Sequence, residues 1–200
     1  MDMPESATNK TRATVLDAIY SRRSVRHFTQ QPVNKETVEA LLDAAVQAPS
    51  AMNSQPWAFI VIQNAGLLKC ISEEAKDLLH REHQPWHSDI ERSRTPVEDP
   101  KFDIFYGAKT LIAICAKRGG FQPLGDCYLA AQNIMLAAHA FGLATCPIGL
   151  ARDILQTETY RNELKVPADY EIVLPIVVGY TTDIASKATR NQARILTWKK

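Results

Sequence analysis

The chain has 200 residues, of which 46% are hydrophobic and 22% are charged, and its formal net charge at pH 7 is +1. This length and composition are typical of one globular domain with a substantial hydrophobic core. The near-neutral charge argues against a dedicated nucleic-acid binder, which usually carries a marked basic excess, so any anion site must be local.

The cysteines and the apolar segments bear on the cellular location. No cysteine belongs to a C-x-x-C pair, and all four lie within apolar patterns: Cys70, Cys115, Cys127 and Cys146. Buried reduced thiols are the expected state, which is consistent with a cytoplasmic protein. The longest apolar stretch, residues 128–143, contains Gln132, Asn133 and His139, which favours a buried helix over a membrane span.

The N-terminal part of the chain begins with polar residues. We expect residues 1–13 to be a disordered lead-in, because they have no apolar core, and residues 14–200 to form a single domain. Thr14 and Asp17 match a capping box. This motif predicts a short helix over residues 15–21.

A second helix, a strand and a third helix are expected next. Apolar residues recur at helical spacing after Asn34, and Pro49 should end that helix. Residues 57–62 form a continuous apolar run and predict a buried strand. Another helical pattern follows Asn64.

The pattern then breaks over residues 80–106, which are polar at first and rich in proline and histidine. Loops of this length within compact domains are often lids, so we expect a lid or a substrate-shaping insert. Trp86, Phe102, Phe105 and Tyr106 are expected to offer apolar or stacking surface there.

The central part of the chain predicts a strand followed by a long helix. Residues 111–115 are continuously apolar and predict the strand. Residues 123–125 are expected to form a turn, with Asp126 as the N-cap of a helix that runs to residue 141. Gly142 would then occupy the C′ position.

The last strand is expected over residues 171–179. Pro175 lacks an N–H group, so this strand should lie at a sheet edge or carry a bulge. The tail from residue 180 has no amphipathic period, yet it carries three large apolar residues: Ile195, Leu196 and Trp198. A partner subunit is the expected surface for it. Helices and strands mix without regular βαβ alternation, which predicts the α+β class.

Three arginines cluster immediately after the first predicted helix. We call Arg22, Arg23, Ser24 and Arg26 the arginine segment. Alternate residues of an extended segment share a face, so two guanidinium groups and one hydroxyl would point the same way, as a phosphate monoester requires. The alternative is a solvated basic turn, where arginines also suit the C-terminal dipole of a helix.

A polar loop with two prolines separates the second helix from the first strand. We call its candidate residues, Pro49, Ser50, Ala51, Asn53 and Gln55, the loop segment. Backbone N–H groups and short amides held at a fixed place suit a planar polar cofactor, because amides both donate and accept hydrogen bonds. The alternative is an ordinary helix-to-strand connection with an asparagine turn.

Two further groups are candidates for the same site. Pro147, Ile148 and Gly149 form the glycine segment, where a glycine lets the backbone approach a ring closely; a simple turn is the alternative. Lys187 and Arg190 in the tail could complete a phosphate clamp, or they belong to a solvated basic tail.

Other familiar sites are absent from the sequence. Pro85 separates His83 from His87, and no nearby cysteine completes a ligand set, so we expect no metal. The chain has neither a G-x-G-x-x-G nor a G-x-x-x-x-G-K motif, which excludes the common dinucleotide and P-loop sites.

Four stretches in order resemble the FMN-dependent nitroreductase family. They are residues 21–28, Ser-Arg-Arg-Ser-Val-Arg-His-Phe; residues 48–57, Ala-Pro-Ser-Ala-Met-Asn-Ser-Gln-Pro-Trp; the helix and glycine segment from Asp126 to Gly149; and the end of the chain, with Val178-Gly179-Tyr180 and Arg190-Asn191-Gln192. The resemblance covers the chain from about residue 14 to the C-terminus.

The resemblance implies an α+β three-layer fold, with a central, mostly antiparallel sheet flanked by helices, and a homodimer that binds FMN at the subunit interface. In such proteins the arginine segment holds the phosphate and ribityl groups, and the loop segment comes from the other subunit. The glycine segment lies against the ring, and a basic tail residue, Arg190 before Lys187, completes the phosphate site. The tail often wraps the partner.

The function implied is hydride transfer from NADH or NADPH, through N5 of the flavin, to a small acceptor such as a nitroaromatic or a quinone. No catalytic side chain is expected, since the flavin carries the chemistry. One alternative is a specialised enzyme on the same scaffold: a reductive dehalogenase, an ene reductase or a flavin-degrading enzyme. Another is a flavin-binding protein without turnover. No nucleic acid or membrane partner is expected.

Overall fold

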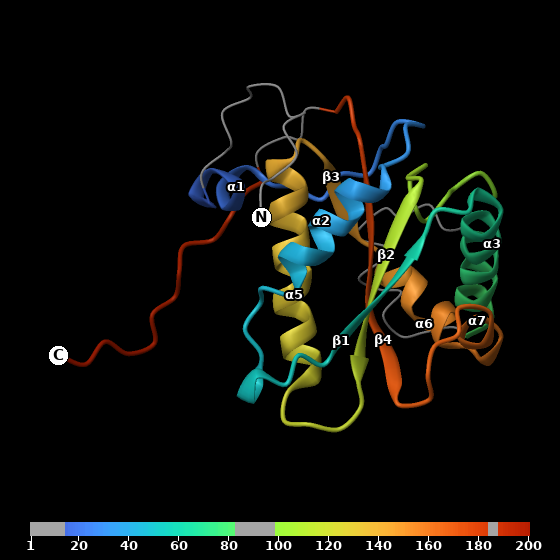
Figure 1. Ribbon diagram of the computed structural model, residues 1–200. Helices are drawn as coiled ribbons and strands as arrows, with labels where there is room; N and C mark the ends of the chain where they lie inside the picture. The colour runs from blue at the N-terminus through green and yellow to red at the C-terminus, as the bar shows by residue number, and fades with distance from the viewer. Residues whose placement is uncertain (1–14, 83–98, 184–187) are drawn as a thin grey trace.

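The computed structural model describes residues 15–82, 99–183 and 188–200. It is an α+β structure built on one antiparallel sheet of four strands in the order β1-β2-β4-β3 (Figure 1). The strands are β1 (Trp57–Ile62), β2 (Thr110–Lys117), β3 (Ala144–Pro147) and β4 (Tyr170–Gly179). The α+β prediction is confirmed.

The helices lie on both sides of this sheet (Figure 1). One side carries α2 (Lys35–Ala45) and α5 (Pro123–Ala140), and the other carries α3 (Ala65–Glu82), α6 (Arg152–Gln156) and α7 (Glu158–Glu163). The short helix α1 (Val15–Ser21) contacts α5. Two 3₁₀ turns complete the structure: η1 (Ala51–Asn53) and η2 (Gly149–Ala151). No helix in the described ranges is long and apolar enough to cross a membrane.

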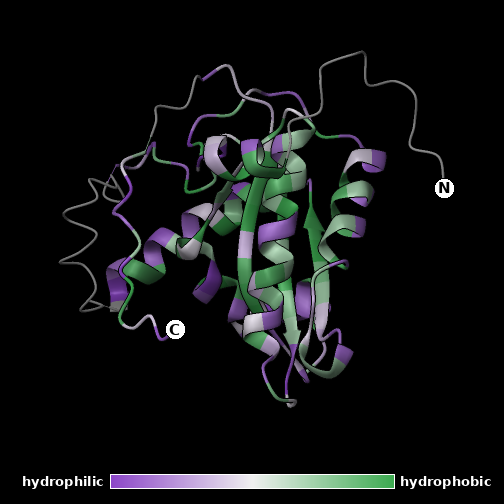
Figure 2. Cartoon of the chain, turned by 90° about the vertical axis from the view of Figure 1, so that its left-hand side faces the viewer, coloured by the Kyte–Doolittle hydropathy of each residue, from purple (hydrophilic) through white to green (hydrophobic). Residues whose placement is uncertain are grey.

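The central strand β2 has no solvent-facing side. Leu111, Ala113 and Cys115 pack in the core on the α3 side, and the alternate residues pack in the core on the α5 side. This is the period-two alternation of a strand covered on both faces. Figure 2 accordingly shows the strands as largely hydrophobic.

The prediction that the strand with Pro175 lies at an edge or carries a bulge is confirmed through its second alternative. The strand is internal, between β2 and β3. It does carry a bulge: Ile114 pairs with Leu174 but Cys115 pairs with Ile172, which leaves Val173 as the extra residue. Pro175 follows the bulge, and its carbonyl accepts a hydrogen bond from the Ile148 N–H at 2.8 Å.

Three other expectations are corrected. The run 57–62 is an edge strand, with Val61 39% exposed, because continuous apolar runs also occur where a helix covers only part of a strand. The helix α2 ends at Ala45, before Pro49. The strand β3 was not foreseen, because four residues are too few to show a period.

The start of α5 also differs from the prediction. The helix begins at Pro123, which occupies the first turn, so residues 123–125 are helical and Asp126 is not the N-cap. Proline is well tolerated there because the first N–H groups of a helix have no intrahelical partner. Gly142 has a φ of 76° after the helix, as expected for a C′ residue.

The N-cap of α2 gives a test of the fold. The Asn34 side chain accepts a hydrogen bond from the Thr37 N–H at 2.8 Å. Asn34→Ala should therefore lower the free energy of unfolding by about 1 kcal/mol, measured by urea denaturation. The exposed Asn162→Ala in α7 is the control and should change it by less than about 0.5 kcal/mol. Equal values for the two variants would contradict the assigned cap.

Candidate functional site

The arginine segment runs along the edge of the sheet. The Arg22 N–H still bonds to the Ala18 carbonyl at the end of α1, at 3.0 Å. The chain then extends beside β3, where Ser24 forms a parallel bridge with Thr145 and the Val25 N–H donates to the Thr145 carbonyl at 3.1 Å. The buried Val25 side chain anchors this extended segment to the core.

Alternate residues of the arginine segment surround one buried thiol. Burial raises the pKa of Cys146, and Arg26, the Ser24 hydroxyl and Arg22 partly offset this rise. The three side chains are thus brought to the same side of the extended segment, as alternation requires. Arg23 bonds to backbone instead: its Nη1 donates to the carbonyls of Tyr20 and Arg22, at 2.8 and 2.7 Å.

Arg22 is the most unusual cation of this cluster. Burial lowers the pKa of its guanidinium, and the nearby charges of Arg23 and Arg190 lower it further. Its Nη1 is buried and has no hydrogen-bond partner among the described residues. Arg190 therefore reaches the arginine segment from the tail, 168 positions along the chain. A buried donor among like charges is costly unless an acceptor arrives.

His139, in the last turn of α5, belongs to the same cluster. Its Nε2 lies 2.7 Å from Ser21 Oγ, and that hydroxyl also donates to the Asp17 carbonyl. Burial, Arg22 and Arg23 all lower the pKa of this histidine. Sequence reasoning missed it, because Ser21 and His139 are 118 positions apart and no local pattern joins them.

The glycine segment lies at the same sheet edge. Pro147 ends β3, the buried Ile148 bonds to Pro175, and Gly149 opens η2. Apart from its chain neighbours, no atom of the described residues would lie within 4 Å of a Cβ placed on Gly149. The glycine therefore faces open space, only four residues beyond the bridge between Ser24 and Thr145.

The loop segment is elsewhere. The Ala51 N–H lies 3.2 Å from both carboxylate oxygens of Asp126, in the first turn of α5, whereas His139 and the arginine segment meet its other end. Asp126 and His139 are 13 positions apart, which corresponds to about 20 Å along a helix. Figure 1 shows η1 and α1 at opposite ends of α5. The loop segment and the arginine segment of one chain therefore do not come together.

The remaining predicted residues divide as follows. Pro49, Asn53 and Gln55 are exposed, and Ser50 and Ala51 are half-buried. Lys187 lies outside the described residues.

The expectation for the aromatic residues of the predicted insert is partly corrected. Phe105 is 1% exposed and belongs to the core, so it offers no stacking surface. Tyr106 is half-buried beside Arg26, packs edge-on against Phe102 at 5.7 Å, and has a pKa raised by burial. Trp86 and most of the lid or insert expected over residues 80–106 lie outside the described residues.

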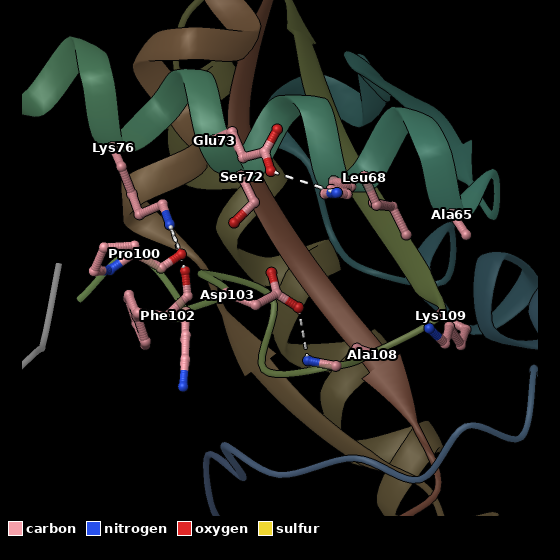
Figure 3. A pocket seen from close by; sticks show the side chains of 13 residues that line it. Ala65, Leu68, Ser72, Glu73, Lys76, Pro100, Phe102, Asp103, Ala108 and Lys109 are labelled. Carbon is pink, nitrogen blue, oxygen red and sulfur yellow. Dashed lines mark hydrogen bonds and ion pairs between the residues drawn. The ribbon is translucent and has the colours of Figure 1, made fainter. Parts of the chain in front are cut away.

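A separate cavity of about 390 Å³ lies between α3 and residues 100–109 (Figure 3). Lys76 Nζ donates to the carbonyls of Pro100 and Phe102, at 3.1 and 2.8 Å, and Ser72 Oγ accepts from the Ile104 N–H at 3.1 Å. These hydrogen bonds hold residues 100–104 against α3. None of the predicted cofactor-binding residues within the described ranges lines this cavity, although Phe102 of the expected insert does.

Comparison with known proteins gives the family. The model of the Nitroreductase family matches residues 19–180. A relative from Methanothermobacter thermautotrophicus, assigned provisionally as an NADH dehydrogenase/NAD(P)H nitroreductase, is 32% identical over 177 residues and is matched over 84% of this chain and 78% of its own. The chloronitrobenzene nitroreductase of Comamonas testosteroni is 29% identical over 214 residues, and the match covers 90% of this chain and 92% of that relative.

The fold comparison agrees. A nitroreductase with bound FMN from Desulfitobacterium hafniense superposes with a TM-score of 0.79 at 25% identity, over 92% of this chain and 98% of that one. The sheet with helices on both faces and the matched 19–180 range lead to one conclusion: the chain belongs to the Nitroreductase family.

Proposed function

We propose that this protein is an FMN-dependent oxidoreductase that passes hydride from NADH or NADPH to a small acceptor such as a nitroaromatic or a quinone. The observation that carries the proposal is the buried Nη1 of Arg22, which has no hydrogen-bond partner in the described part of the chain and lies near the cations Arg23 and Arg190. An anion with several acceptor oxygens satisfies such a donor and offsets the crowded charge. The phosphate of FMN has this chemistry, and FMN is bound in the Desulfitobacterium relative.

The chain's own residues divide the work of binding. Arg22, Arg23 and Arg190 would hold the phosphate, with Ser24 as a neutral donor beside it. Gly149 leaves room at the same sheet edge for the flavin ring, since no described residue other than its chain neighbours lies within 4 Å of a Cβ placed there. When bound, FMN supplies the hydride-transfer chemistry, and the protein supplies orientation and electrostatics.

Completion of the site is proposed to require a second copy of the chain. The loop segment lies at one end of α5 and the arginine segment at the other. In the proposed two-fold dimer, the loop segment of each copy lies against the arginine segment of the other copy. Because contacts across a two-fold axis are made twice, both sites are completed together. Exposed apolar residues on α1, on the first half of α5 and in the tail offer surface for it: Val15, Leu16, Ile19, Tyr20, Tyr128, Leu129, Ile195, Leu196 and Trp198.

The acceptor is the finer part of the proposal. The nitroaromatic class is favoured by the chloronitrobenzene nitroreductase relative. Purified protein would be titrated anaerobically with NADH and NADPH while the absorbance spectrum is recorded, and then reoxidised with nitroaromatic, quinone, halophenol and enone acceptors. Bleaching by a nicotinamide followed by fast reoxidation with the first two supports the proposal. Preference for a halophenol or an enone indicates a specialised enzyme, and bound flavin that no nicotinamide bleaches indicates a binding protein.

The proposed function gives a prediction for Arg22. Arg22→Ala should weaken FMN binding at least tenfold, because each charge-assisted hydrogen bond to phosphate contributes about 1.5–3 kcal/mol. Quenching of flavin fluorescence during titration of FMN-free protein measures the dissociation constant. The exposed Arg81→Ala in α3 is the matched control and should bind as the wild type does. Riboflavin affinity should barely change in either variant, since riboflavin has no phosphate; an equal loss for both ligands would contradict the phosphate assignment.

A further prediction concerns the pH dependence of the protein's stability. The pKa of His139 is lowered in the folded protein, so the unfolded state binds more protons at low pH. Stability linked to this group is therefore fully present above its unfolded pKa of about 6.5 and is lost as pH falls through that value. In the FMN-free protein, Tm should decline between pH 7.5 and 5.5 more steeply than in His139→Gln. Saturating FMN should narrow this difference, because phosphate offsets the neighbouring arginines; parallel Tm profiles would refute the assignment.

A further inference from the structure

The turn within the loop segment has an unfavourable backbone conformation. Met52, Asn53 and Gln55 have φ values of 54°, 54° and 45°, the left-handed region that residues other than glycine rarely adopt. Asparagine tolerates this region better than methionine and glutamine do, because its short polar side chain can bond to nearby backbone. Such residues persist only where surrounding contacts over-determine the backbone, and they cluster at ligand clamps.

Among the described residues, the strained turn is not packed into the core. Met52 is 96% exposed, and none of the residues of η1 is buried. The turn closes on itself: the Gln55 N–H donates to Ser50 Oγ at 3.0 Å, and Gln55 Nε2 donates to Asn53 Oδ1 at 3.2 Å. The conformation is therefore held by local hydrogen bonds, while its side chains remain available for a contact from another molecule.

Asp126 links this turn to the rigid part of the molecule. Its carboxylate is only 4% exposed, and both oxygens lie 3.2 Å from the Ala51 N–H, the first residue of η1. A buried carboxylate is costly unless hydrogen-bonded. Asp126 and the turn are 75 positions apart, so the contact fixes the turn to the start of α5 and not to its own flanking segments.

We infer that Asp126 is a positioning residue for the FMN site of the partner subunit: by holding the Ala51 N–H, it presets the strained turn that completes the other protomer's site. The inference rests on the proposed function. Asp126 acts through the turn and does not itself touch the cofactor. Its effect must then appear in trans, on the site whose phosphate is held by the partner's Arg22.

The first measurement is FMN binding by the Asp126→Ala homodimer. Loss of the anchor should weaken FMN binding at least tenfold, the effect of removing a hydrogen bond to a charged group. Asp153→Ala is the matched control, an exposed carboxylate in the first turn of α6, and should bind FMN as the wild type does. Asp126→Leu, which keeps a branched side chain but has no acceptor oxygen for the Ala51 N–H, replaces the alanine variant in every step if that variant does not fold.

The decisive measurement uses mixed dimers. Arg22→Glu and Asp126→Ala chains with different affinity tags are co-expressed, and the heterodimer is isolated through both tags. One of its two sites then combines the native Arg22 of one chain with the Asp126-anchored turn of the other. The second site carries both defects. We expect one FMN per dimer, bound with the wild-type dissociation constant and the wild-type visible circular dichroism.

The outcomes separate this inference from the proposed function. If Asp126 acts on its own chain's site, or only through general destabilisation, the mixed dimer has no intact site and FMN binding stays at least tenfold weakened, which overturns the inference. A wild-type protein that binds no FMN overturns the proposed function itself. If the Arg22→Glu homodimer binds FMN like the wild type, the phosphate site lies elsewhere, and both the site assignment and this inference fail.

Discussion

The rigidity of α5 is the constraint on which the rest of the site depends. A helix of 18 residues cannot shorten without losing its hydrogen-bond ladder, so whatever it holds at its two ends stays apart. At the first turn Asp126 holds the loop segment, and at the last turn His139 meets the arginine segment through Ser21. The same helix packs against the sheet and α2, which fixes both ends relative to the core.

This separation explains why a single chain looks incomplete. One end of α5 carries crowded cations with a buried donor that lacks an acceptor, and the other end carries a strained turn directed into solvent. Each feature is unfavourable for the isolated chain. Both become favourable if the missing contacts come from a cofactor and from a second copy of the chain, which is the arrangement that the proposal adopts.

The sheet supplies the other fixed element. β3 carries the glycine segment at one edge, and the extended arginine segment pairs with β3 at Thr145. The bulge at Val173 reverses the alternation of β4, so that Ile172 and Val177 both face the α3 side although they are five positions apart. On the other side of β4, the Pro175 carbonyl accepts a hydrogen bond from Ile148, which continues the pairing of β3 with β4. This bond holds the start of the glycine segment against the sheet.

The sequence alone determined helices and strands that carry a local signal, such as the capping box at residues 15–21 and the apolar run at residues 57–62, because these signals depend only on neighbours along the chain. It also determined the arginine, loop and glycine segments as candidates, through their side-chain chemistry. Only the tertiary structure decided that Pro175 lies in an internal strand, that Asp126 anchors Ala51, and that His139 and Arg190 join Arg22. These contacts join residues 75 to 168 positions apart, and no local propensity encodes a distance of that kind.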